Sequence, residues 1–308
     1  MITAVCPNPS VDKIYGLHSM SPGVNRCSET QSFPGGKGVH VALALSELNS
    51  NTTLLGFWGG PTGRWIRDEC KKKSIPTSGA ETSEWNRSCI TLLTRDEFNN
   101  SEILETGPVI TKDQVALFYS EAEKEASTAR ALCVSGSWPE GAPENRYKKL
   151  KEICERMGAD LWVDASGDNL KLALEVQPYG IHLNKEEAAE LLDENMSPSE
   201  MIRELHQTVK LVALTDGANG LYLAFKNRYY HAVCSVDEVI STVGAGDCLT
   251  AGILHSHYRD SDPVEIAKTG VACGAANCVN PDLGMIKKSD VKFYLKRSNV
   301  QKLDETHG

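Results

Sequence analysis

Residues 241–252 combine glycines, a carboxylate and the start of an amphipathic helix. They read Ser241-Thr-Val-Gly-Ala-Gly-Asp-Cys-Leu-Thr-Ala-Gly252. Because glycine lacks Cβ, the backbone N–H groups of Gly244, Ala245 and Gly246 can converge on an anion, and a helix amino terminus adds partial positive charge. Asp247 could accept a proton from a hydroxyl that attacks a phosphoryl group held there. An acidic residue in a first turn is also a common helix-stabilising charge, so the segment needs support from elsewhere.

A second glycine cluster, Pro34-Gly-Gly-Lys-Gly-Val-His-Val-Ala42, also leads into a predicted helix. Lys37 could meet a phosphate as a mobile point charge, while Gly35 and Gly36 would let a ligand lie against the main chain. The spacing differs from a GxxxxGK[ST] phosphate loop, and we expect no strand close before it. Taken alone, the cluster could be only a tight turn.

Short apolar runs alternate with helix-period segments along most of the chain, which predicts a mostly parallel sheet covered on both faces. Ligands collect at the carboxyl ends of such strands. The predicted strands are 52–57, 132–135, 161–164, 181–183 and 211–215, and the predicted helices are 38–48, 62–73, 111–127, 143–157 and 197–207. A hairpin is expected over 220–225 and 229–234, followed by helices over 245–258 and 263–279.

Two stretches, about 13–33 and 86–106, break this alternation because strand-like residues occur there without a helical pattern. In the second, 88–94 and 103–106 flank the polar turn 96–101. We expect one domain over 1–308, with these strands forming a small β-lid that could also pair two chains into a homodimer. Ordinary surface hairpins fit the pattern equally well.

The composition and net charge limit the kinds of partner that the protein can bind. The 308 residues are 41% hydrophobic with a formal net charge of -9, and the basic residues are scattered, which argues against nucleic acid or an anionic membrane surface as partner. There is no run of about 18 apolar residues, and prolines interrupt the start of the chain, so we expect a cytoplasmic protein. The ten cysteines stand singly within apolar segments, as reduced buried hydrophobes do.

The two glycine clusters belong to a longer ordered series of motifs that spans nearly the whole chain. The sequence resembles the PfkB group of ribokinase-like carbohydrate kinases, nearest to the sugar-phosphate branch that contains 1-phosphofructokinase and tagatose-6-phosphate kinase. The series comprises Asn8-Pro-Ser-Val-Asp12, Gly35-Gly-Lys-Gly38, Ser135-Gly-Ser-Trp-Pro-Glu-Gly141, Asp164-Ala-Ser-Gly167, Asn184-Lys-Glu-Glu187, Thr215-Asp-Gly-Ala218 and Thr242-Val-Gly-Ala-Gly-Asp247.

The resemblance implies a ribokinase-like three-layer α/β fold and an ATP-dependent phosphotransferase with Mg²⁺ as cofactor. Asp247 corresponds to the catalytic base, and the segment from Gly244 to Gly246 corresponds to the anion hole for the transferring phosphoryl group. Asp12 looks like the carboxylate that grips sugar hydroxyls below the lid, although a turn-forming aspartate fits the local pattern too.

On the nucleotide side, the resemblance assigns Asn184 and Glu187 to the pair that organises Mg²⁺ and its waters, with Glu187 acting through water. A hard cation that keeps several waters suits such a pair. On pattern alone, Glu187 would be only a charge in a helix's first turn. The remaining nucleotide-binding assignments are Thr215, Gly217 and Gly220 in a loop, Thr242 before the anion hole, and Asn277 and Gly284 around the adenine.

The branch clasps the phosphate already on its substrate with a lysine, a lid arginine and a serine. Lys37, Arg87 and Ser137 stand at those places here. Arg26 resembles a further basic lid residue, although an exposed arginine on a strand is usually just solvated. The expected substrate is therefore a small sugar phosphate.

Two amides that the branch uses to read sugar hydroxyls are replaced. His40 stands where Asn is usual, and 86–89 read Asn-Arg-Ser-Cys in place of Thr-Arg-x-Asn. His40 could hydrogen-bond a hydroxyl or cap the helix start. Residues 181–184 also lack the lysine of the usual Lys-Pro-Asn. These departures leave the particular sugar open.

Two other functions stay open: a kinase of the same fold that acts on an unphosphorylated sugar or nucleoside, and a non-catalytic sugar-phosphate sensor. The intact Gly-Ala-Gly-Asp segment argues against the sensor. An NAD-dependent dehydrogenase is disfavoured, because neither glycine cluster follows a first strand with an acidic residue about 20 positions on.

Overall fold

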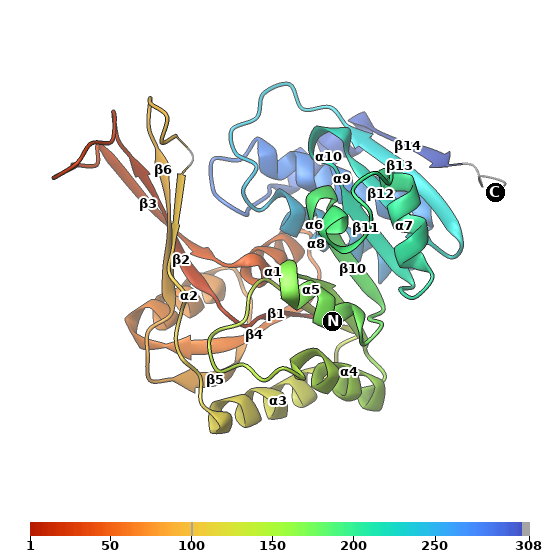
Figure 1. The fold of residues 1–308 in the computed structure, drawn as a ribbon, viewed down its shortest axis with the longest axis horizontal. Helices are drawn as coiled ribbons and strands as arrows, with labels where there is room; N and C mark the ends of the chain where they lie inside the picture. Colours follow the sequence, from red (N-terminus) through yellow and green to blue (C-terminus); the bar gives the residue numbers. More distant parts are fainter. Residues whose placement is uncertain (100, 304–308) are drawn as a thin grey trace.

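The computed structural model describes residues 1–99 and 101–303 and is built on a ten-stranded sheet, shown in Figure 1. The strand order is β14-β13-β12-β11-β10-β9-β8-β1-β4-β5. Neighbours are parallel from β5 to β11 and antiparallel from β11 to β14. The strands are β1 (Ile2–Cys6), β4 (Thr52–Gly59), β5 (Thr77–Thr82), β8 (Ala131–Ser135), β9 (Asp160–Asp164), β10 (Gly180–Asn184), β11 (Leu211–Thr215), β12 (Leu221–Phe225), β13 (Arg228–Cys234) and β14 (Ser298–Leu303).

Helices cover both faces of this sheet, because alternate residues of each buried strand point to opposite sides. In β11, Leu211 and Ala213 join one hydrophobic cluster, while Val212 and Leu214 join the other. The first cluster is completed by α1 (Lys37–Glu47), α2 (Gly60–Lys72), α8 (Ala245–His257), α9 (Pro263–Cys278) and α10 (Lys288–Arg297). The second is completed by α3 (Lys112–Ala126), α4 (Arg146–Met157), α5 (Gly167–Leu174), α6 (Lys185–Leu191) and α7 (Pro198–His206). The result is the predicted three-layer α/β arrangement.

A second, four-stranded sheet projects from this body, as Figure 1 shows for β2, β3 and β6. Its order is β3-β2-β6-β7, with bounds β2 (Ser10–Gly16), β3 (Glu29–Gly35), β6 (Arg87–Leu93) and β7 (Ser101–Leu104). We call it the lid sheet. The strands β6 and β7 fall within the second stretch predicted to form a lid, while β2 begins three residues before the first stretch and β3 ends two residues after it. Asn100 in the predicted turn lies outside the described residues. Because β2 follows β1 after three residues, the lid sheet is connected directly to an interior strand of the large sheet.

One local expectation was wrong. The strand β3 runs directly into the Gly35 cluster, where no strand was expected close before it. Its sequence, Glu-Thr-Gln-Ser-Phe-Pro-Gly, lacks apolar alternation because its first four residues are exposed and it is held by backbone pairing with β2. The spacing still differs from a GxxxxGK[ST] loop.

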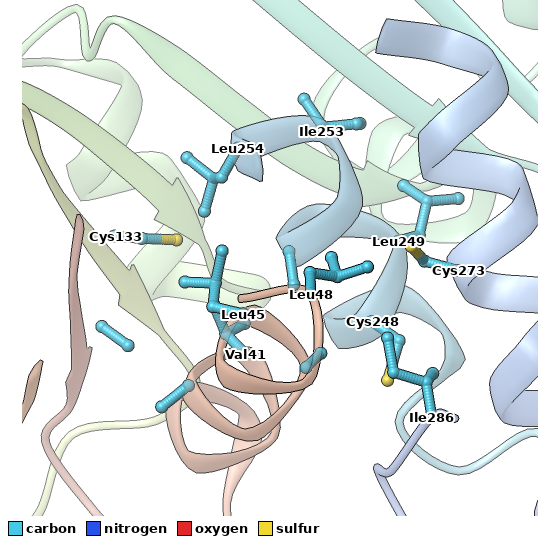
Figure 2. Close-up of a cluster of buried hydrophobic side chains, with 14 of the residues drawn as sticks. Val41, Leu45, Leu48, Cys133, Cys248, Leu249, Ile253, Leu254, Cys273 and Ile286 are labelled. Carbon is cyan, nitrogen blue, oxygen red and sulfur yellow. The ribbon is translucent and has the colours of Figure 1, made fainter. Parts of the chain in front are cut away.

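Helices α1 and α8, which begin at the two glycine clusters, pack against each other. Figure 2 shows Val41 and Leu45 of α1, and Leu48 directly after this helix, beside Leu249 and Leu254 of α8. The side chains of Leu45 and Leu254 are fully buried. Truncating such a leucine to alanine typically costs about 2–5 kcal/mol of stability. This contact brings together two helix starts that lie about two hundred residues apart in the sequence.

Two further expectations can be compared with the described chain. All ten cysteines are unpaired, and most are buried. Among the helices that the structure describes, none is both long enough and apolar enough to cross a membrane.

Candidate active site

The start of α8 forms a small cradle of main-chain amides. Gly244 is the residue before the helix, with φ +82°, and a Cβ there would stand 2.5 Å from Gly284 Cα, so only glycine fits. The Ala245 N–H donates to the Thr242 carbonyl oxygen at 3.1 Å, so it is used within the turn. The amides left for an anion are those of Gly246 and Asp247, which have no helical partner in a first turn. Of the predicted Gly244–Gly246 set, only the Ala245 amide is engaged within the turn, so the assignment of these amides to an anion stays a prediction.

Three buried side chains from three elements meet beside this cradle. His40 of α1 has its Nδ1 2.8 Å from Asp247 Oδ2 and its Nε2 3.5 Å from Asp12 Oδ2 on β2. The Ser10 hydroxyl donates to Asp12 Oδ1 at 2.6 Å. All three members of the cluster are more than nine-tenths buried. The imidazole thus lies between Asp247, the predicted base, and Asp12, the carboxylate predicted to bind sugar hydroxyls. It does not cap the start of α1, and neither nitrogen points to open space.

The electrostatics of this cluster follow from its charges. Burial opposes a charge on His40, but the two facing carboxylates of Asp12 and Asp247 outweigh it and raise the pKa of the imidazole to about 10. For Asp12, burial favours the neutral acid, but the His40 contact, the Ser10 hydrogen bond and the nearby Arg87 together lower the pKa. At neutral pH, His40 is therefore a cation between carboxylates.

The structure shows why position 35 is a glycine, which the sequence alone did not reveal. A Cβ on Gly35 would lie 2.0 Å from Asp12 Cγ, so the Asp12 carboxylate itself occupies the space over that residue. Gly36 has φ +96° and is the residue before α1, with Cys6 Sγ 2.9 Å from where its Cβ would be. The space beside these glycines is therefore filled by the protein's own side chains. The sequence interpretation was that a ligand would lie there.

On the other side of the cradle, a second buried carboxylate holds a lysine and a histidine. Asp164, at the end of β9, contacts Lys37 Nζ at 3.0 Å and His182 Nδ1 at 3.4 Å. His182 Nε2 lies 3.3 Å from the Thr215 hydroxyl. Burial would favour the neutral acid, but Lys37 and His182 together drive the pKa of Asp164 well below its usual range. The pKa of Lys37 is raised, chiefly by Asp164 and further by Asp247 and Glu187.

The two imidazoles lie against opposite ends of the amide cradle. A Cβ on Gly246 would stand 2.8 Å from His182 Cε1, and one on Gly244 would stand 3.4 Å from His40 Nδ1. His40 is also covered by Gly284, where a Cβ would stand 2.1 Å from its Cδ2. Gly246 thus makes room for the His182 ring and Gly284 for the His40 ring.

A cavity of about 710 Å³ opens on the His182 side, a size suited to a nucleotide. The predicted nucleotide residues Asn184, Thr215, Gly217, Gly220 and Thr242 line it, together with Ala245 and Gly246 of the cradle. Small residues of α9, Gly274 and Ala275, form part of the wall and leave room for a flat ring. The turn η1 (Gly217–Asn219) is followed by Gly220 with φ +92°, where a Cβ would stand 2.1 Å from the Ala232 carbonyl oxygen.

Two residues expected around the adenine lie elsewhere. Asn277 is buried and donates from Nδ2 to the Val243 carbonyl oxygen at 2.9 Å, so it supports the turn before the cradle. Gly284 packs on the His40 ring. Neither lines the cavity. Both residues instead contact the loop around the cradle, and their role at the adenine stays a prediction.

Asn184 and Glu187 form a reciprocal capping box at the start of α6. The Glu187 N–H donates to Asn184 Oδ1 at 2.8 Å, and the Asn184 N–H donates to Glu187 Oε2 at 2.8 Å. Glu187 Oε1 is left for an outside partner. No cluster of three or more His, Cys, Asp or Glu side chains that could hold a metal occurs in the described residues. A cation that arrives with phosphates and keeps its waters fits such a pair, whereas a fully protein-bound ion does not.

Lys37, the partner of Asp164, is also one of the predicted phosphate-clasp residues, together with Ser137 and Arg87. Lys37 lies against the turn of Gly136, whose Cβ would stand 3.5 Å from Lys37 Cβ, and Ser137 follows that turn exposed. Arg87 on β6 donates to the carbonyl oxygens of Asn8 and Glu105. Arg26 is exposed in the loop between β2 and β3, away from these contacts. Lys37, Ser137 and Arg87 are thus partly accessible, while Arg26 is simply solvated in this conformation.

Comparison with known sequences decides the family. Residues 8–285 match the pattern of the pfkB family carbohydrate kinases. The chain belongs to the PfkB family. As in that family, it is an ATP-dependent carbohydrate kinase, and the resemblance drawn from the ordered motifs is confirmed.

Solved structures agree on the fold. A Staphylococcus aureus protein provisionally assigned as a phosphofructokinase is 28% identical, with 99% of each chain covered and a TM-score of 0.85. Phosphofructokinase-2 from Escherichia coli, solved with substrates and products, is 23% identical over 96% of this chain and 98% of its own, with a TM-score of 0.88. Arabidopsis thaliana ribokinase, complexed with ribose and ATP, is 17% identical with a TM-score of 0.78, covering 96% and 98%. The PfkB chain therefore has the ribokinase-like fold.

Two residues of this PfkB site were missed by sequence reasoning. Asp164 begins one of the quoted motifs but received no role, and His182 was noted only as the loss of a lysine. A carboxylate at the end of a predicted buried strand was the available signal, since a buried aspartate requires a partner.

Proposed function

We propose that this PfkB kinase transfers the γ-phosphoryl group of ATP to a hydroxyl of a sugar phosphate. One observation supports this most: the buried Asp247 carboxylate stands beside the free amides of Gly246 and Asp247, between the nucleotide cavity and the lysine and arginine near the lid sheet. Similarity to structures named as phosphofructokinases agrees with a phosphorylated acceptor.

In this proposal Asp247 is the general base. Its carboxylate takes the proton of the acceptor hydroxyl while that oxygen forms its bond to the γ-phosphorus and the bond to the β-phosphate oxygen breaks, releasing ADP. The amides of Gly246 and Asp247 face the transferring group, where negative charge is spread over its oxygens. Aligning the hydroxyl and the phosphorus in one line is the main contribution of such a site.

The existing phosphate of the acceptor is assigned to Lys37, Arg87 and Ser137. Lys37 stays charged because its pKa is raised, chiefly by Asp164, and its side chain is 38% exposed, so it can reach a ligand without leaving that partner. Arg87 offers a planar donor set suited to phosphate oxygens. Together they distinguish a sugar phosphate from a plain sugar.

Asn184 and Glu187 are proposed to hold the Mg²⁺ that accompanies ATP, through its waters. When bound, the ion would neutralise charge on the nucleotide phosphates. The capping box holds the Glu187 side chain in one conformation beside the end of β10. Its second carboxylate oxygen is therefore already oriented for a water of the ion.

The lid sheet is also proposed as the place where two chains could pair. Ile103 and Leu104 of β7, which lies at the edge of the lid sheet, are 51% and 58% exposed. An apolar edge strand is suited to pairing with another chain. Light scattering of the protein and an Ile103→Lys variant would test this, and a monomeric native protein would remove the proposal.

A panel of sugars tests the function. The purified protein is incubated with MgATP and matched pairs of ketoses and aldoses, with and without a phosphate, and ADP formation is followed. We expect kcat/KM to be at least about 10-fold higher for one phosphorylated member than for its plain partner, since charge-assisted contacts contribute about 1.5–3 kcal/mol. Preference for plain sugars or nucleosides would favour the other kinase class, and binding without turnover would favour a sensor.

A further inference from the structure

His40 occupies a place that the kinase mechanism described above does not use. The residue is 3% exposed, and its ring lies against Gly244 and Gly284, of which Gly284 could not carry a Cβ without displacing it. Its two nitrogens face Asp247 on α8 and Asp12 on β2. A buried ring with fitted neighbours and carboxylates at both nitrogens has one orientation available.

We propose that His40 is a positioning residue, which as a cation fixes the Asp247 carboxylate and couples it to the lid sheet through Asp12. The inference rests on Asp247 being the base of the proposed function. Because Nδ1–H donates to Oδ2 of Asp247, that oxygen is occupied and the Oδ1 atom is the one left to face an acceptor hydroxyl. His40 itself exchanges no proton with the substrate.

The charge of His40 is set by the groups that face it from each packed element. Asp247 of α8 and Asp12 of β2 raise its pKa. Two nearby cations interact mainly with carboxylates and not with the imidazole. Lys37 of α1 is paired with Asp164, and Arg87 of β6 lowers the pKa of Asp12. The neighbouring segment around residue 284 presents a glycine. A neutral amide at position 40 could orient Asp247 but would leave the two buried carboxylates with only the charges of Arg87 and Lys37, which are not hydrogen-bonded to them.

The coupling to the lid sheet comes from the longer of the two contacts. The distance from His40 Nε2 to Asp12 Oδ2 is 3.5 Å, which is beyond an ordinary N–H···O bond of about 2.9–3.0 Å. His40 Nε2 has no hydrogen-bond partner among the described residues. Asp12 lies on β2, beside Arg87 on β6, so a shift of the lid sheet by about 0.5 Å toward α1 would complete the bond. Closure over an acceptor would then tighten the grip on the base.

The experiment compares the wild-type protein with His40→Asn, which restores the amide usual in the sugar-phosphate branch. His255→Asn is the matched control, because His255 lies near the other end of α8, bonded to Ser50. Steady-state kinetics are measured from pH 7 to 10 with the best acceptor of the panel. For His40→Asn we expect kcat to fall about 10–100-fold with the KM for ATP unchanged, since misorientation of a catalytic group costs up to about 10²-fold.

The pH profile separates positioning from a merely structural role. The wild-type kcat should decline as the pH approaches the range in which His40 loses its proton, whereas His40→Asn should lack that decline. Nitrogen-15 NMR of histidine-labelled protein, assigned with the same variant, should show both ring nitrogens of His40 protonated at pH 8. A neutral ring at pH 8, or a His40→Asn variant with wild-type kcat and pH profile, would overturn the inference.

These outcomes can be told apart from failure of the proposed function. If only plain sugars are phosphorylated, the proposed function fails, but the NMR measurement and the pH profile with those sugars still report on His40. If a sugar phosphate is the acceptor and the ring is neutral, the proposed function stands and this inference fails.

Discussion

The two sides of the amide cradle carry similar residues in different settings. On the acceptor side, His40 is enclosed between two carboxylates, Asp12 and Asp247. On the nucleotide side, His182 shares the single carboxylate of Asp164 with Lys37 and leans on the Thr215 hydroxyl. The cluster around His40 therefore holds the groups proposed to manage a proton, while Asp164 holds two cations, of which His182 lies beside the nucleotide cavity and Lys37 belongs to the proposed phosphate clasp. Variants on each side should consequently change different kinetic constants.

The largest effect is expected where the two sides meet. Asp247→Asn keeps the shape of the side chain and removes its basicity, so kcat should fall about 10²–10⁴-fold while ATP and acceptor still bind. Initial rates and calorimetric titration with ATP would measure the two quantities. Near-normal turnover of this variant would falsify the base assignment, and Asp290→Asn on α10 serves as a surface control.

A substitution of Arg87 on the lid sheet should change acceptor binding without changing ATP binding. Arg87→Ala removes a charge-assisted contact to the acceptor's phosphate, so the KM for the sugar phosphate should rise about 10–100-fold with the KM for ATP unchanged. The preference for the phosphorylated over the plain sugar should shrink by the same factor. Arg95→Ala, an exposed arginine just beyond the other end of β6, is the matched control. An unchanged KM for the sugar phosphate would remove Arg87 from the clasp.

A smaller effect is expected on the nucleotide side. His182→Asn loses the contacts to Asp164 and Thr215 and leaves a gap beside Gly246, so the KM for ATP should rise about 3–10-fold. The KM for the acceptor should not change. If the acceptor constant moved instead, the division of the cradle into two sides would be wrong.

Much of the fold was within reach of the sequence, because buried parallel strands and amphipathic helices have strong periodic patterns. The strand β11 was predicted at its observed bounds, and α8 and α9 to within one residue. Elements that were not predicted, such as β14 and α10, carry exposed polar residues, and β14 is an edge strand of the sheet. Their existence depends on backbone pairing or docking that a local pattern does not contain.

The site was predictable only as a set of motifs. Glycines at a helix start and an aspartate after them predict an anion cradle with a base, and these residues do lie together. The contact between His40 and Asp247 joins positions 207 apart, so it depends on how α1 packs on α8. Position 284 must also be understood from packing: it is a glycine because the His40 ring fills the space that a side chain would need, and its sequence neighbours do not reveal this.

The smallest effect concerns stability. The folded pKa of His40, about 10, lies above its unfolded value of about 6.5. A raised pKa contributes stability that is fully present below about pH 6.5, declines above it and is lost as the pH rises through about 10. Asp12, whose folded pKa is lowered, stays ionised throughout this range and does not offset the change.

The measurement is the difference in Tm between the wild-type protein and His40→Asn at pH 6, 8 and 10. Groups that titrate in both proteins cancel in this difference. We expect a gap of several degrees at pH 6, in line with about 2–4 °C per kcal/mol for a chain of this size class, and a gap close to zero at pH 10. A gap that stays constant with pH would mean that His40 contributes packing alone, and the acceptor side would then differ from the nucleotide side in shape but not in charge.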